Sequence, residues 1–255
     1  MIAIKKIFLI AFLGFSSLSY GGTIDPNIPD QKYLDFGSQF YCVVKVCGNY
    51  EDNSLFCASG VIIEKHFVLT AAHVVQGYKT CYVRVDDKKF LLTDIVIHKD
   101  FGGQFGTGDI ALGYCEQGFD LKNFPPLYID DDEKGKIASI AGWGLTGNFN
   151  TGTHKSDNKL RAGSNIVDGV DKDMLICSPS KWGNPDHSVL EYMIGSGDSG
   201  GGLFIDGKLA GINSCVMAVG RSPMSKYGEE SGHTRVSKFL DWIKESKQKL
   251  EKQNE

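Results

Sequence analysis

The sequence predicts an all-β protein of two antiparallel barrels with six strands each, followed by one C-terminal α-helix. From Phe40 onward, short apolar and β-branched runs alternate with turn residues. No helical segment separates these runs, which favours antiparallel pairing over a parallel sheet. The 31 glycines against 7 prolines also indicate many tight turns, which are typical of strands rather than helical bundles.

Composition and charge exclude several classes of function. The 255 residues are 42% hydrophobic and 23% charged, as in folded globular proteins. A net charge of -4 lacks the basic excess of nucleic-acid-binding proteins, so we expect no nucleic-acid partner. The seven cysteines and six histidines show neither Cys-x-x-Cys nor His-x-x-x-His spacing, so we expect no metal site.

Residues 1–21 predict an export signal. A charged start precedes the apolar run Ile7–Phe15, which is too short to span a membrane. Small residues follow, and we expect cleavage after Ser19 or Gly21. No later stretch approaches 18 apolar residues, so we expect a secreted or periplasmic protein with no membrane anchor.

We expect residues 22–39, which are polar and contain two prolines, to form an irregular leader. The first barrel, at about 40–118, contains six predicted strands, and an acidic, proline-containing segment around Phe119–Lys136 follows it. The predicted strands are Cys42–Cys47, Phe56–Ile63, Phe67–Thr70, Thr80–Val85, Phe90–Ile97 and Ile110–Tyr114.

The second barrel, at about 134–236, also contains six predicted strands. These are Ile137–Gly142, Leu160–Val167, Met174–Cys177, Leu203–Ile205, Lys208–Ile212 and His233–Val236. A helix is predicted at about 237–250, because Phe239, Leu240 and Ile243 recur at helical spacing opposite a polar face.

Ser199 lies in the sequence Gly197-Asp198-Ser199-Gly200-Gly201. A serine needs a neighbouring base to become nucleophilic, and glycines allow a turn whose amide N–H groups converge on an oxyanion. The pentapeptide also fits Gly-x-Ser-x-Gly, the nucleophile elbow of α/β-hydrolases. An elbow leads into a helix, however, whereas residues 203–210 predict a strand, an Asp-Gly turn and another strand.

A base and an acid precede Ser199 in the chain. His73 ends the sequence Thr70-Ala71-Ala72-His73, and Asp109 lies in the run Gly108–Leu112. Histidine titrates near neutrality and suits a general base, and a buried aspartate fixes its tautomer. The α/β-hydrolases place both partners after the serine, so this order argues against an elbow.

These motifs, together with Ala141-Gly142-Trp143-Gly144 and Thr234-Arg235-Val236, closely resemble those of the trypsin/chymotrypsin-like serine peptidases. The resemblance extends from about Phe40 to Lys247 and implies a chymotrypsin-like fold with the active site between the barrels. It implies His73 as the general base, Asp109 as its orienting acid and Ser199 as the nucleophile. The oxyanion hole would consist of the Gly197 and Ser199 amides.

The resemblance thus implies that residues 40–255 form a secreted serine endopeptidase that works through an acyl-enzyme on Ser199. Such an enzyme needs no cofactor, and we expect it to act as a monomer on protein or peptide substrates. One alternative is a catalytically silent binding module on the same fold, against which the intact triad argues. Another is an esterase with an α/β-hydrolase fold.

The substrate-binding residues implied by the resemblance are Met193, Ile194, Ser214, Cys215, Val216 and Ser231. Met193 stands where trypsin-like enzymes carry an aspartate, so we expect an uncharged, apolar residue at substrate position P1. Two alternatives stay open. Glu191 could reach the pocket, or His233 could favour an acidic P1 residue.

Two features depart from the family. The usual mature start, Ile-Val-Gly-Gly after a basic residue, is missing, and only a loose match follows Lys32. In trypsin-like zymogens the α-amino group freed there pairs with the aspartate before the serine, so the partner of Asp198 is left open. Val74 and Gly195 stand where relatives have cysteines.

The disulfide pattern stays open. Cys42 or Cys47 with Cys57 or Cys81 is possible across neighbouring strands, and an odd number of cysteines leaves at least one thiol unpaired or intermolecular.

Overall fold

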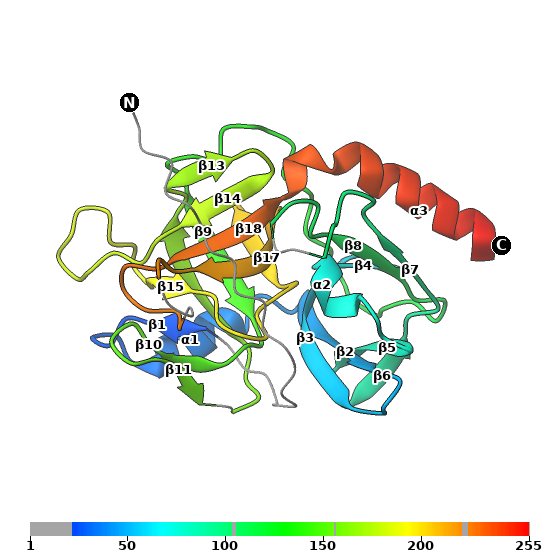
Figure 1. Ribbon diagram of the computed structural model, residues 1–255, viewed down its shortest axis with the longest axis horizontal. Coiled ribbons are helices and arrows are strands. Elements are labelled where there is room, and N and C mark those ends of the chain that lie inside the picture. The colour runs from blue at the N-terminus through cyan, green and yellow to red at the C-terminus, as the bar shows by residue number, and fades with distance from the viewer. Residues whose placement is uncertain (1–21, 104–105, 156, 221–223, 255) are drawn as a thin grey trace.

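The computed structural model describes residues 22–254 except 104–105, 156 and 221–223. Two seven-stranded antiparallel sheets curl side by side, and a four-stranded sheet lies beside the second (Figure 1). Helix α3 (Leu240–Asn254) leaves the second sheet and runs along the first. The predicted all-β fold with two antiparallel units and a C-terminal helix is therefore confirmed, with seven strands in each sheet in place of six.

The first sheet has the strand order β6-β5-β2-β3-β4-β8-β7. Its strands are β2 (Val43–Asn49), β3 (Leu55–Glu64), β4 (Phe67–Thr70), β5 (Thr80–Val85), β6 (Lys88–Leu91), β7 (Asp94–Ile97) and β8 (Ala111–Tyr114). The predicted run Phe90–Ile97 divides into two strands. The Leu92 N–H donates to the Cys81 carbonyl of β5, whereas the Thr93 N–H donates to the Tyr114 carbonyl of β8. The chain therefore passes there from one edge of the sheet to the other.

The second sheet has the strand order β12-β9-β16-β17-β18-β14-β13. Its strands are β9 (Ile137–Gly142), β12 (Arg161–Ile166), β13 (Gly169–Asp171), β14 (Met174–Cys177), β16 (Gly202–Ile205), β17 (Lys208–Met217) and β18 (Glu230–Arg235). Strand β13, which pairs with β14, is the strand that the sequence did not predict. Strands β17 and β18 extend beyond their predicted ends because they pair with each other as far as Met217 and Glu230.

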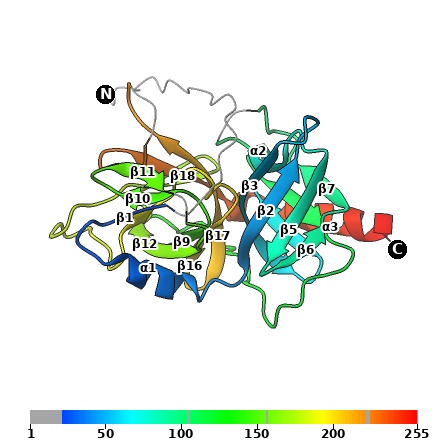
Figure 2. The same cartoon turned by 90° about the horizontal axis from the view of Figure 1, so that it is seen from below.

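The leader expected at residues 22–39 is not irregular. Strand β1 (Thr23–Ile24) lies between β10 (Thr146–Asn148) and β15 (Tyr192–Met193), and β11 (Gly152–Lys155) completes this third sheet. Helix α1 (Asp30–Gly37) then packs against β12 (Figure 2). Both prolines precede this helix and therefore do not interrupt it. Its first residue, Asp30, pairs with the buried Arg161 at 2.7 Å, which anchors the helix to the second sheet.

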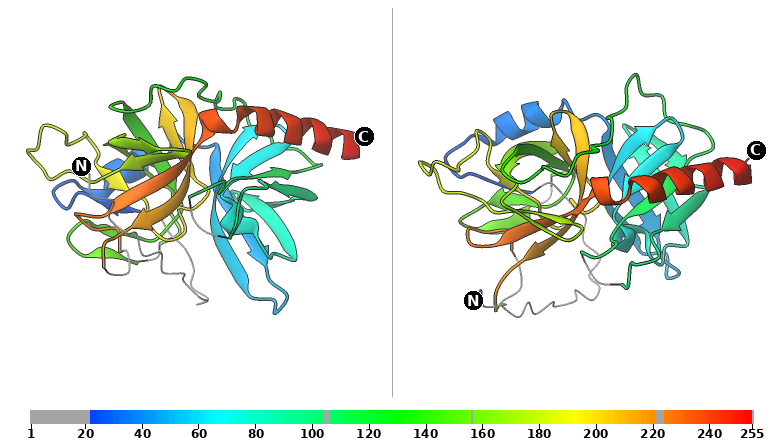
Figure 3. Two further views of the ribbon diagram at one scale, coloured as in Figure 1. Left: turned by 45° about the horizontal axis from the view of Figure 1, so that its top comes forward. Right: turned by 90° about the horizontal axis from the view of Figure 1, so that it is seen from above.

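The C-terminal helix completes the core of the first sheet. A short 3-10 turn, η1 (Val236–Lys238), precedes α3, which runs along the first sheet (Figure 3). Its residues Ile243 and Leu250 are buried in the same apolar core as residues of the first sheet. A second core fills the other half of the molecule. Of the helices in the described ranges, none has the length and apolar character needed to cross a bilayer.

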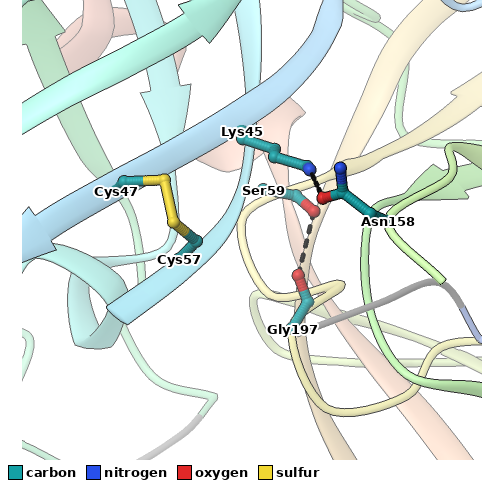
Figure 4. The surroundings of a disulfide bond; sticks show 6 residues. All are labelled: Lys45, Cys47, Cys57, Ser59, Asn158 and Gly197. Atoms are coloured by element: carbon teal, nitrogen blue, oxygen red, sulfur yellow. Dashed lines mark hydrogen bonds between the residues drawn. A yellow bond between two sulfur atoms is a disulfide. The ribbon is translucent and has the colours of Figure 1, made fainter. Parts of the chain in front are cut away.

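One disulfide joins the first pair of strands. Cys47 of β2 lies directly opposite Cys57 of β3, and the two are bonded (Figure 4). This resolves the pairing that the sequence left open. Cys42 and Cys81 are free and buried.

Candidate active site

His73 belongs to the short helix α2 (Ala72–Val75), which follows β4 and lies on the side of the first sheet that faces the second (Figure 1). Its ring Nδ1 lies 2.8 Å from the Asp109 carboxylate, and its backbone N–H donates to the other oxygen of that carboxylate at 3.0 Å. Because an ionised carboxylate only accepts hydrogen bonds, Nδ1 carries the ring proton. Nε2 is therefore the nitrogen that can accept a proton.

Asp109 is fully buried, whereas one fifth of the His73 side chain is exposed. The Ser214 hydroxyl of β17 donates to the Asp109 carboxylate at 2.6 Å, and the Thr234 hydroxyl of β18 donates to its backbone carbonyl at 2.9 Å. Burial acts to raise the pKa of Asp109. The charge of His73 and the hydrogen bonds from His73 and from the Ser214 hydroxyl act in the opposite direction and hold the pKa below its ordinary value. Asp109 therefore stays ionised while facing His73.

Ser199 lies in the loop before β16 and is partly exposed. Its carbonyl accepts a 2.9 Å hydrogen bond from the Ser59 N–H of β3. The Ser59 hydroxyl donates to the Gly197 carbonyl at 3.0 Å (Figure 4). Ser59 of the first sheet thus holds the loop that carries Ser199, which belongs to the second half of the molecule.

Gly200 brings this loop against the strand that leads to His73. Its φ of +83° is a conformation that favours glycine. A Cβ there would lie 2.1 Å from the Thr70 hydroxyl and 3.1 Å from the Ala71 nitrogen. The loop of Ser199 and the segment before His73 therefore pack backbone to backbone, and only glycine fits between them.

The amides expected to form the oxyanion hole belong to this same loop. Among the residues that the structure describes, the Gly197 and Ser199 N–H groups donate to no protein acceptor. The loop is instead closed by bonds from Asp198 to Gly195 and from Gly201 to Asp198. Both N–H groups are thus free to bind an oxygen of another molecule.

Asp198 is buried and points away from solvent. Its carboxylate accepts hydrogen bonds from the N–H groups of Gly22 at 2.8 Å, Gly144 at 2.6 Å and Gly195 at 2.7 Å. Burial raises the pKa of Asp198 to about 6, although these hydrogen bonds work in the opposite direction. No cationic side chain of the described ranges pairs with it.

The residues expected to bind substrate fall into two groups. Ser214, Cys215 and Val216 lie on β17, and Val216 is the direct strand partner of Ser231 on β18. Met193 belongs to β15, which pairs with β1 in the third sheet, and Ile194 follows it; both are buried. The structure thus places Ser231 beside the β17 group, and it places Met193 in the third sheet with Ile194 directly after it.

Glu191 is bound within its own loop. Its carboxylate accepts hydrogen bonds from the Ser180 N–H at 2.8 Å and from the Ser188 N–H and hydroxyl at 2.7 Å each. Burial raises the pKa of Glu191.

His233 belongs to a buried polar chain that the sequence did not indicate. Its Nδ1 lies 2.9 Å from Asn213 Oδ1, and its Nε2 lies 3.0 Å from the Ser231 hydroxyl. The Asn213 amide in turn donates to the carbonyls of Asp198 and Ala141. Burial lowers the pKa of His233 to about 3, so its imidazole is neutral near pH 7.

Sequence motifs found His73, Asp109 and Ser199 but not Ser59 or Asn213. These two act by hydrogen bonds to segments more than ten residues away, and no local pattern marks them. As for metals, no group of three or more His, Cys, Asp or Glu side chains in the described part of the chain could hold an ion.

Comparison with known proteins identifies the family. The family model for trypsin matches residues 38–243. Chymotrypsin of Phaedon cochleariae is 30% identical over 206 residues, which cover 72% of this chain and 70% of that protein. Chymotrypsin-like elastase family member 1 of Macaca fascicularis is 28% identical over 247 residues, which cover 86% of this chain and 83% of that protein.

Solved structures share the fold. HL collagenase superposes with a TM-score of 0.65 at 19% identity and covers 82% of this chain and 94% of its own. Neuropsin, a serine protease of mouse brain, superposes with a TM-score of 0.64 at 20% identity and covers 88% and 98%. The chain therefore belongs to the trypsin family of serine endopeptidases.

Proposed function

We propose that this protein is an exported serine endopeptidase that cleaves peptide bonds through an acyl-enzyme on Ser199. The observation that carries the proposal is the buried Asp109 bonded to the partly exposed His73, beside the loop of Ser199. An ionised, oriented carboxylate behind a histidine is what a general base near a serine requires.

In the proposed acylation step, Ser199 Oγ attacks the substrate carbonyl carbon while His73 Nε2 takes the hydroxyl proton. Asp109 stabilises the imidazolium that forms, and the Gly197 and Ser199 N–H groups bind the oxyanion. His73 then gives the proton to the departing amine as the peptide bond breaks. In deacylation a water molecule repeats the sequence, and Ser199 recovers its proton.

For substrate position P1 we propose an uncharged, apolar residue. Glu191 supports this, because its carboxylate is already bound by Ser180 and Ser188 and offers little attraction for a basic side chain. His233 supports it as well, because a neutral imidazole bonded on both nitrogens supplies no positive charge for an acidic one.

We propose that the enzyme acts as a monomer outside the cytoplasm, on proteins or peptides. The predicted export signal at residues 1–21 supports this location. The two alternatives lose support. Ser199 leads into strand β16 rather than a helix, which contradicts an α/β-hydrolase elbow, and nothing in the site favours a silent binding module.

Digestion of a denatured protein mixture, with the cleavage sites mapped by mass spectrometry, tests the proposal. We expect internal cleavages after apolar residues with the wild-type protein and none with Ser199→Ala. Ser38→Ala, a change at an exposed serine that directly follows α1, should cleave like the wild type. Equal cleavage by Ser199→Ala would contradict the mechanism, and cleavage mainly after charged residues would contradict the pocket.

A further inference from the structure

Three basic side chains lie next to one another on one face of the first sheet. Lys45 of β2 is the direct strand partner of Arg84 of β5, and Arg84 is the partner of Lys89 of β6. Direct partners in a sheet point to the same face, so the three residues form one row across three adjacent strands. Neighbouring strands lie about 4.8 Å apart, so this basic row (Lys45, Arg84 and Lys89) is about 10 Å long.

The basic row has no carboxylate partner. The ion pairs in the described ranges use other cations, such as Lys79, Lys136 and Arg161, and none of them includes a residue of the row. Asp86 and Asp87, in the exposed turn between β5 and β6, take part in none of these pairs either. Like charges on directly opposed strand residues destabilise a sheet, and a bound anion would remove this repulsion.

The inner end of the basic row is the buried Lys45. Its ammonium lies 4.5 Å from the centre of the Trp143 ring and donates a hydrogen bond to the side-chain carbonyl of Asn158 (Figure 4). Both of these groups are neutral. Burial and the charge of Arg84 lower the pKa of Lys45 to about 8, so most of the ammonium stays protonated near pH 7. Two neighbouring positive charges therefore stand here without an anion.

The basic row leads away from the loop of Ser199. Ser59 is the direct partner of Lys45 on the other side of β2, and its hydroxyl donates to the Gly197 carbonyl (Figure 4). From there the row passes outward to Lys89, which is exposed on the edge strand β6. Three strand spacings from Ser59 to Lys89 amount to about 14 Å, which an extended peptide covers with about four residues.

A second row on the same face contains an aromatic and an apolar side chain. Tyr82 and Leu91 are direct partners and stand two residues from Arg84 and Lys89 along the same strands. Lys89 Nζ lies 4.7 Å from the centre of the Tyr82 ring, and Leu91 is 56% exposed. An aromatic ring and an exposed leucine beside cations suit a polypeptide with acidic and apolar side chains, because such groups are typical of contacts between proteins.

We propose that the basic row binds acidic side chains of a protein substrate, at the residues that follow the cleaved peptide bond. Position P1 precedes that bond and is expected at β17 and β18 of the second sheet. The residues after the bond therefore extend from Ser199 toward the first sheet, where the row begins. This inference rests on the proposed peptidase function and adds an acidic class of substrate to it.

Two peptides with the same residues before the cleaved bond test the inference. One carries glutamate at the second to fifth positions after the bond, and the other carries glutamine there. We expect kcat/KM to be about tenfold higher for the glutamate peptide at low ionic strength, because several exposed ion pairs form at once. The difference should shrink as salt is added, since salt screens such pairs.

Lys88 and Lys89 provide a matched pair of variants. Adjacent residues of a strand point to opposite faces, so Lys88, the partner of Val85, faces away from the basic row. Lys89→Gln should lower the preference for the glutamate peptide about threefold, and Arg84→Gln with Lys89→Gln should abolish it. Lys88→Gln removes the same charge from the same strand and should keep the preference. Thermal unfolding establishes that all variants are folded.

A short substrate separates this inference from the proposed function. It ends in a chromogenic amide directly after P1 and has no residues for the basic row to bind. The double variant should hydrolyse it within about twofold of the wild-type rate, against a loss of about tenfold on the glutamate peptide.

The possible failures differ. A wild-type protein that hydrolyses none of these substrates would contradict the proposed function and, with it, the inference. Hydrolysis with equal rates for the two peptides, or equal losses in Lys88→Gln and Lys89→Gln, would overturn the inference alone. Sedimentation that shows a dimer of the wild type but not of the double variant would assign the row to a second copy of this chain, and would overturn it as well.

Discussion

The contact between His73 Nδ1 and Asp109 decides which imidazole nitrogen is left to act as a base. Only a carboxylate at Asp109 keeps the proton on Nδ1, because an amide in its place could donate to that nitrogen. The Ser214 hydroxyl keeps the carboxylate in position. The proposed mechanism thus depends on the charge of a residue that never contacts the substrate.

We predict that Asp109→Asn lowers kcat about 10⁴-fold near neutral pH, since it favours the wrong histidine tautomer. The fold should survive, because the amide has nearly the shape of the carboxylate. Peptide hydrolysis, with Asp120→Asn at an exposed site as control, measures the effect. A loss of less than tenfold would contradict the role given to Asp109.

His233 should make the protein less stable in acid. Its pKa is about 3 in the folded protein against 6.5 ordinarily, so between these values the unfolded chain binds a proton that the folded chain does not. This contribution to the free energy of unfolding therefore falls as pH decreases, by up to about 1.4 kcal/mol per pH unit.

We predict that the unfolding free energy of His233→Gln depends less steeply on pH than that of the wild type between about pH 6 and 3.5. The difference in slope should correspond to about one proton bound on unfolding. Urea unfolding across that range measures both slopes. Identical slopes would mean that His233 titrates normally in the folded protein.

At the scale of the element, the sequence predicted long strands well and short ones badly. The predicted runs that alternate or are continuously apolar became β2–β9, β12, β14 and β16–β18. The missed strands β1, β10, β11, β13 and β15 have two to four residues, and β1 pairs with segments far away in the chain, such as Thr23 with Gly147. Such short runs are too short to show the alternation of apolar and polar residues that predicts a strand.

Helix α1 was missed for another reason. Pro26 and Pro29 suggested an irregular segment, but both stand before the first helical residue, where a missing N–H costs nothing. The partner that anchors the helix, Arg161, is distant in sequence. Tertiary contacts of this kind have no local signal.

The disulfide should stabilise the β2–β3 hairpin. Cys47 and Cys57 close a short loop with a sequence separation of 10. We predict that changing both cysteines to alanine lowers the unfolding free energy by about 2.5 kcal/mol, mainly because the unfolded chain gains conformational entropy without the bond. Denaturant unfolding measures the loss. The free, buried Cys42 changed to alanine is a control for packing alone, and an equal loss there would contradict a role for the bond.

On the scale of the whole molecule, the site forms where the two sheets meet. The first sheet provides His73, Asp109 and the Ser59 contacts, and the second provides Ser199 together with the hydroxyls of Ser214 and Thr234. The order of the motifs predicted which residues share the site. It did not predict that the Gly22 N–H donates a hydrogen bond to Asp198, because Gly22 belongs to none of the motifs and the two residues are far apart in the sequence.

The central claim is that Ser199 is an assembled nucleophile in the mature protein. Intact mass of the exported protein without its signal, before and after reaction with a fluorophosphonate, tests it most directly. We predict one adduct per chain in the wild type and none in Ser199→Ala. A folded wild-type protein that gains no adduct, or an adduct that persists in Ser199→Ala, would contradict the account.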